Sequence, residues 1–279
     1  MMTRRELMKV AGAAALAGVP LAGCRTRPVS ASVDLTDPAW IDPSALFLRP
    51  GSERGHVNHG WLDARHSFSF ASYRDPRHMG WGPLRVINED RIAGGRGFGW
   101  HPHESMEILT WIIDGALEHR DSMGNGSVIR PGEIQYMSAG SGVRHSEFNA
   151  LEAEPTHLLQ IWIQPSFWGG EPRYDQRQTS MAQRREGWTL LASGAQDTDA
   201  IHIRQDAQLL TAAPGADGEL SWTVPEGRRT WVQVIRGEVA VQGLPLVGGD
   251  AVGTHRVAGE LLVQGRSADA EVMLFDLPG

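Results

Sequence analysis

Hydrophobic and polar residues alternate along most of the chain after about residue 46, as in strands that bury one face. The alternation is clear at 68–70, 84–87 and 108–113, and the last run stops at the turn pair Asp114 and Gly115. Sixteen prolines and 33 glycines are scattered rather than clustered, so turns separate many short segments. This spacing predicts an all-β fold built from small antiparallel barrels.

A weaker copy of the same layout recurs in the second half of the chain. The segment 230–239 echoes 109–117, and 247–252 echoes 130–134. Between the copies, 164–186 is rich in Pro, Gly, Arg and Gln and has poor periodicity, which indicates a connection. We therefore expect one β-barrel unit that is duplicated in tandem.

The N-terminus has the features of an export signal. Arg4 and Arg5 precede an uncharged stretch rich in Ala and Gly, and Cys24 follows a sequence similar to the lipobox of bacterial lipoproteins. A mature N-terminal helix is the alternative, but an apolar stretch of about 14 residues is short for a membrane span. We expect 1–23 to be a twin-arginine and lipoprotein signal peptide and 24–44 to be a tether. The protein would then lie on the periplasmic side of the cell envelope, held to the membrane only by a lipid anchor on Cys24.

The charge balance argues against a nucleic-acid partner. The formal net charge is −7, and removal of the signal segment, with its three basic residues and one acidic residue, leaves −9. Cys24 is the only cysteine, so the folded part needs no disulfide.

Two short motifs carry candidate metal ligands. His101 and His103 are two residues apart, as are His145 and Glu147, and side chains at this spacing on a strand project from the same face. Two such strands facing a barrel interior would bring three nitrogens and one oxygen to a common point. A single pair of this kind is usually a chance surface pair or a hydrogen-bonded core pair, but two pairs in one barrel favour a metal site.

These pairs lie in the glycine-rich motifs 97–107 and 140–147, which resemble the two cupin motifs of pirins and pirin-like quercetin dioxygenases. Further segments similar to that family are 60–70, 82–88, 118–125 and 274–278. The resemblance implies two tandem cupin (jelly-roll β-barrel) domains. We assign the N-terminal, metal-binding cupin to 45–170. The C-terminal cupin, at 171–279, lacks a His-x-His motif and is expected to be metal-free.

By the same resemblance, the metal ligands are His101, His103, His145 and Glu147. Glu107 is expected to hydrogen-bond and orient a ligating imidazole rather than to ligate. The remaining histidines are interpreted as hydrogen-bonded or surface residues. They are His56, His59, His66, His78, His119, His157, His202 and His255.

The resemblance implies a metal-dependent dioxygenase that acts on quercetin-like flavonols, or related phenolic or enolic compounds, with O₂. The expected cofactor is one divalent transition metal ion. Fe(II) suits the mixed imidazole and carboxylate ligands, and Mn, Co, Ni, Cu and Zn are also compatible with them. Glu147 is the residue expected to carry acid/base catalysis. The alternative is a metal-binding interaction or regulatory module without turnover, and in either case we expect a monomer.

Overall fold

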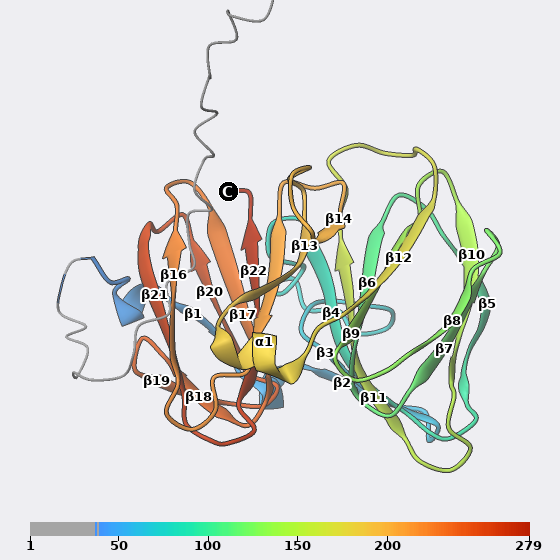
Figure 1. Cartoon of the computed structure of the whole chain (residues 1–279), viewed down its shortest axis with the longest axis horizontal. Coiled ribbons are helices and arrows are strands. Elements are labelled where there is room, and N and C mark those ends of the chain that lie inside the picture. Colours follow the sequence, from blue (N-terminus) through green and yellow to red (C-terminus); the bar gives the residue numbers. More distant parts are fainter. Residues whose placement is uncertain (1–36, 38) are drawn as a thin grey trace, which may run out of the picture.

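The computed structural model describes residues 37 and 39–279 and arranges them as two β-barrels side by side (Figure 1). Each barrel pairs a seven-stranded sheet with a four-stranded sheet. The described part also contains short 3₁₀ turns at Pro43–Ala45 and Gly51–Glu53 and one helix, α1 (Met181–Glu186). The expected all-β fold with two tandem barrels is therefore confirmed.

The N-terminal barrel contains both candidate metal motifs. Its seven-stranded sheet has the order β12-β9-β6-β11-β4-β3-β2, with β2 (Gly55–Asn58), β3 (Leu62–His66), β4 (Leu84–Ile92), β6 (Glu107–Asp114), β9 (Glu133–Ser138), β11 (Thr156–Ile163) and β12 (Arg173–Gln178). Its four-stranded sheet has the order β5-β10-β7-β8, with β5 (Gly97–His103), β7 (Leu117–Asp121), β8 (Gly126–Ile129) and β10 (Val143–Asn149).

The C-terminal barrel repeats this architecture. Its seven-stranded sheet has the order β1-β20-β17-β22-β15-β13-β14, with β1 (Phe47–Arg49), β13 (Thr189–Ser193), β14 (Ile201–His202), β15 (Gln208–Ala212), β17 (Arg229–Arg236), β20 (Ala251–His255) and β22 (Glu271–Leu277). Its four-stranded sheet has the order β16-β21-β18-β19, with β16 (Glu219–Val224), β18 (Glu238–Val241), β19 (Leu244–Val247) and β21 (Gly259–Gly265).

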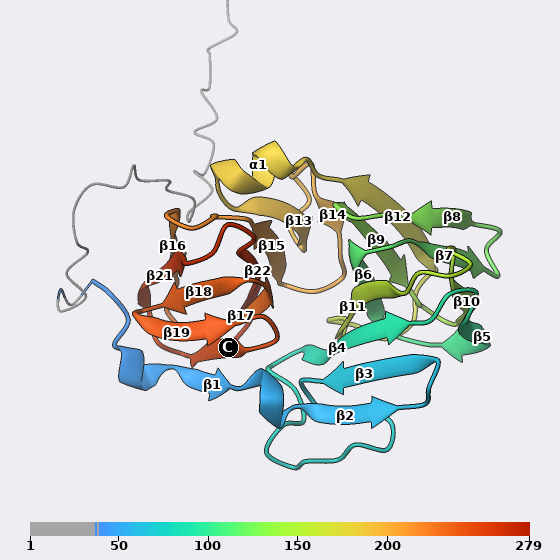
Figure 2. The same ribbon diagram turned by 90° about the horizontal axis from the view of Figure 1, so that it is seen from below.

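Two strands pair with the barrel on the other side of the expected domain border. β1 precedes the N-terminal barrel in the chain but lies along the C-terminal barrel (Figure 2). There it pairs with β20, with Phe47 opposite Gly253. β12 follows the border drawn at residue 170 but pairs with β9 of the N-terminal barrel. Ile41, within the segment expected to be a tether, is buried and donates its backbone N–H to the carbonyl of Glu260. The two barrels are thus tied together by exchanged chain segments.

The largest apolar core lies between the barrels, where residues of both seven-stranded sheets pack together. The strand β6 contributes apolar side chains on both of its faces. Leu109 and Trp111 belong to the core shared by the two sheets, whereas Ile108 and Ile112 belong to smaller clusters in the N-terminal barrel. Burial on both faces explains why 108–113 is an almost continuous hydrophobic run.

The two barrel interiors differ in chemistry. An apolar cluster of valines, leucines and tryptophans fills the C-terminal barrel. The N-terminal barrel instead buries polar side chains from several strands, among them Asn88, Asp90, Thr110, Gln135 and Gln160. Because buried polar groups are costly unless they are paired, this interior points to a site with a chemical role.

The expected signal peptide, Cys24 and most of the expected tether lie outside the described residues. Within the described ranges, the structure contains no helix with the length and apolar character needed to cross a bilayer.

Candidate metal centre

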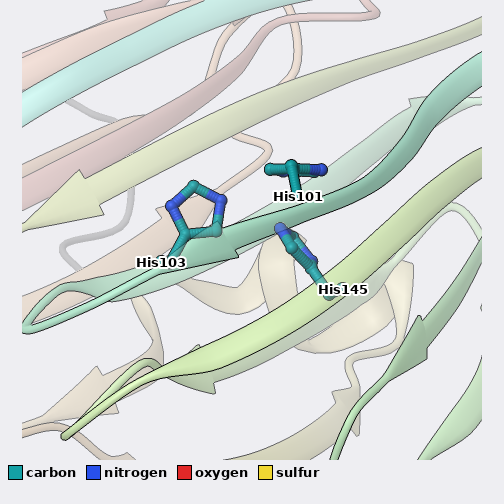
Figure 3. A group of neighbouring side chains, drawn as sticks. All are labelled: His101, His103 and His145. Carbon is teal, nitrogen blue, oxygen red and sulfur yellow. The ribbon is translucent and has the colours of Figure 1, made fainter.

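Three histidines converge where β5 and β10 pair (Figure 3). His145 lies directly opposite His101 in the antiparallel register, and His103 follows on the same strand as His101. The ring centroids are 4.3 Å apart for His101 and His145, and 4.8 Å apart for each pair that includes His103. One ligand nitrogen from each ring lies within 4.8 Å of the other two, so the group could hold a metal ion.

The hydrogen bonds leave ligand nitrogens of these rings free. His101 Nδ1 lies 2.8 Å from the carbonyl oxygen of Gly99, which can only accept, so Nδ1 carries the proton and Nε2 keeps its lone pair. His145 is 1% exposed, and its Nε2 has no hydrogen-bond partner among the residues that the structure describes. A buried nitrogen without a partner is unfavourable by itself but fits a metal ligand.

Glu147 belongs to a second group, and the structure does not gather all four predicted ligands into one set. Glu147 shares its group with His145 and His119, whose ligand atoms also lie within 4.8 Å of one another. A register shift between His145 and Glu147 places Glu147 opposite Phe98. The carboxylate is 3% exposed and accepts hydrogen bonds from Gln160.

His119, interpreted from the sequence as a hydrogen-bonded or surface residue, is hydrogen-bonded, but its place beside the cluster was not predicted. It is fully buried on β7, and its Nδ1 lies 3.5 Å from Nδ1 of His145. The Gln135 amide donates to the same His119 nitrogen at 2.9 Å, so that nitrogen accepts and His145 is left as the donor. His119 Nε2 then donates to Asp121 at 3.3 Å. His119 and Asp121 are two residues apart, as are the residues of the other two motifs. This spacing could have indicated from the sequence that His119 lies near the cluster.

The contacts of Glu107 show that its predicted role is wrong. Its carboxylate accepts hydrogen bonds from the hydroxyls of Tyr136 and Ser138, both at 2.6 Å, and from the backbone N–H of Arg204 at 2.9 Å. None of these partners is an imidazole. Because Arg204 belongs to the second half of the chain, Glu107 joins the two barrels.

Burial keeps the imidazoles of His103 and His145 neutral. Removal from water, together with the neighbouring histidines, lowers the pKa of His103 to about 4 and that of His145 to about 3. Both rings are therefore unprotonated at neutral pH, which is the form that binds a metal. Burial and the nearby Glu147 charge raise the pKa of Asp90 to about 7.

Aromatic rings flank the cluster on two sides. The edge of Trp162 meets His103 with ring centroids 4.9 Å apart, and Phe98 meets His101 at 6.3 Å. Outside β5 and β10, an open pocket of about 420 Å³ borders His103 and Arg144.

A tandem pair of cupin barrels, with side chains suited to a divalent metal gathered in the first, is the class of protein that this fold and site define. Residues 48–163 match the family model described as Pirin, and residues 190–277 match the model described as the quercetinase C-terminal cupin domain. The chain belongs to the pirin family.

Several relatives are similar over most of their length. A protein of Escherichia coli K12 named quercetin 2,3-dioxygenase is 44% identical over 233 residues, which cover 84% of this chain and 99% of the relative. A pirin-like protein of Caulobacter vibrioides is 42% identical, with coverage of 82% and 97%. The crystal structure of the bacterial pirin YhhW from Escherichia coli in complex with nickel(II) matches with a TM-score of 0.79 and 43% identity, covering 84% of this chain and 99% of that one.

Proposed function

We propose that the protein is a metal-dependent dioxygenase that acts on quercetin-like flavonols or related phenolic or enolic compounds with O₂. The observation that carries the proposal is the group of His101, His103 and His145, with free ring nitrogens beside the buried carboxylate of Glu147. The relatives named quercetin 2,3-dioxygenase support the substrate class.

The proposal gives each residue of the cluster a task. His101, His103, His145 and Glu147 would hold one divalent ion, which supplies Lewis-acid activation of the substrate's enolic oxygen and of O₂. Glu147 accepts the proton of the enolic hydroxyl. The rings of Phe98 and Trp162 line the flat substrate and exclude water from it.

The identity of the ion is part of the proposal. Fe(II) suits the mixed nitrogen and oxygen ligands, and Mn, Co, Ni, Cu and Zn fit the same donors. A relative's structure is described in complex with nickel(II), which supports a divalent metal.

One experiment tests the function and separates it from a binding or regulatory role. The purified protein is analysed for metal, mixed with quercetin without oxygen, and then supplied with O₂ while oxygen consumption is recorded. We expect turnover that falls at least 100-fold in His145→Ala and Glu147→Gln, as for loss of an essential ligand or base. His255→Ala, an exposed histidine of the C-terminal barrel, is the matched control and should retain activity. Bound metal and bound quercetin without oxygen consumption would favour the module without turnover.

The cellular location also remains a proposal. The Arg4 and Arg5 signal and Cys24 support export and lipid anchoring on the periplasmic side of the envelope. Cell fractionation of the wild type and Cys24→Ser tests it, because the variant should leave the membrane fraction. The monomer is a further prediction, which light scattering of the purified protein would check.

A further inference from the structure

A glutamine on the opposite sheet holds the Glu147 carboxylate. Gln160 lies on β11 of the seven-stranded sheet, whereas Glu147 lies on β10 of the four-stranded sheet. The Gln160 amide nitrogen donates to both carboxylate oxygens, each at 3.1 Å. Both residues are buried, with 8% of Gln160 and 3% of Glu147 exposed. The contact therefore spans the interior of the barrel and fixes both oxygens at once.

A threonine on the neighbouring strand anchors the amide of Gln160. Thr110 lies opposite Gln160 in the register of β6 and β11 and is fully buried. Its hydroxyl donates to the amide oxygen of Gln160 at 3.0 Å. The Thr110 bond restrains the amide of Gln160 at the position from which its N–H groups reach Glu147.

The contact fixes where the two oxygens of Glu147 lie. A carboxylate oxygen of Glu147 lies within 4.8 Å of ligand nitrogens of His145 and His119, so its position decides whether it can join a histidine at one ion. We infer that Gln160, anchored by Thr110, is a positioning residue that holds the Glu147 carboxylate in place beside His145. This inference rests on the proposed function, because Glu147 acts as ligand and base only in that proposal.

Cobalt(II) titration of the metal-free protein tests the inference without relying on turnover. The dissociation constant and the visible absorption of bound Co(II) are measured for wild type, Gln160→Met and Thr110→Val. Removing partners of this kind weakens metal binding by about 10- to 100-fold, which we expect for Gln160→Met together with a changed cobalt spectrum. Thr110→Val keeps the amide and should show a smaller loss in the same direction.

A double variant shows whether the effect passes through Glu147. In a Glu147→Gln background, adding Gln160→Met should change cobalt binding by less than about twofold, because the carboxylate it positions is gone. Gln233→Met removes a buried glutamine of the C-terminal barrel and is the matched control. It should bind Co(II) as the wild type does.

The results test the positioning role of Gln160 separately from the proposed dioxygenase function. The inference is overturned if Gln160→Met binds Co(II) with wild-type affinity and spectrum, if its loss persists in the Glu147→Gln background, or if Glu147→Gln itself has no effect. If Gln160→Met fails to fold by circular dichroism, an unchanged Thr110→Val overturns it instead. A wild type that binds Co(II) but never consumes O₂ with quercetin refutes the proposed dioxygenase and leaves the positioning result standing.

Discussion

Replacing Asp90 by asparagine should make the metal-free protein more stable, and increasingly so as the pH rises. Asp90 is 5% exposed inside the N-terminal barrel, and within residues 39–279 its Oδ1 has no hydrogen-bond partner. Loss of water, then the charges of Glu147 and Glu89, raise its pKa from the ordinary 3.8 to about 7. A raised pKa means that the folded state holds the proton more tightly than the unfolded state. The stability that the folded protein owes to protonated Asp90 is therefore fully present below pH 3.8, and it is lost as the pH rises through 7.

The magnitude follows from these two pKa values. Each pKa unit corresponds to about 1.4 kcal/mol, so ionisation of Asp90 costs about 1.7 kcal/mol of folding free energy at pH 5 and about 4 kcal/mol at pH 8. Asparagine cannot ionise. Its constant packing difference cancels when two pH values are compared, so the advantage of Asp90→Asn should grow by about 2.5 kcal/mol between pH 5 and pH 8.

Urea unfolding in the presence of a chelator measures this difference. Free energies of unfolding of wild type and Asp90→Asn are compared at pH 5, 6, 7 and 8. The histidines titrate in both proteins, so the difference between them isolates Asp90. An advantage that stays constant from pH 5 to pH 8 would show that Asp90 is ionised throughout and would refute the reasoning.

Three further predictions concern the histidine cluster, a tight turn and a buried ion pair. Because burial lowers the pKa values of His103 and His145, the metal-free protein should lose stability as the pH falls from about 6.5 toward 4, and melting temperatures across this range would check it. Gly140→Ala should lower the melting temperature by several degrees, since φ is +49° and the added methyl would clash with the backbone carbonyl of Gly170. Glu271→Gln should destabilise by about 3–5 kcal/mol in urea unfolding, because Arg184, 2.6 Å away, loses its buried charge partner; an unchanged midpoint would contradict it.

The periodicity of the chain was enough to predict the two barrels and the meeting of the three histidines. Alternation on strands fixes which side chains share a face, so His101 and His103 had to point the same way. The irregular register beside Glu147 could not be predicted, because a local bulge leaves no mark in an alternating pattern. It is this irregularity that places Phe98 rather than Gly99 opposite Glu147.

The polar residues inside the N-terminal barrel could not be predicted for a different reason. Thr110 and Gln160 are single polar residues within hydrophobic runs. Sequence alone does not distinguish a polar side chain turned into a barrel from one turned to water. The same ambiguity made the buried His119 look like an ordinary isolated histidine.

The pairing of β1 with β20 sets a limit on how the protein can acquire its native state during synthesis. Residues 47–49 leave the ribosome early, yet their hydrogen-bonding partners are residues 251–253. At about 5–20 residues per second, roughly 10–40 s pass before those partners are made. Over that interval β1 has no sheet to join, and a truncated chain that ends at the domain border leaves this strand unpaired. Dissecting the two barrels for separate expression therefore requires moving the segment 40–49 to the C-terminal half.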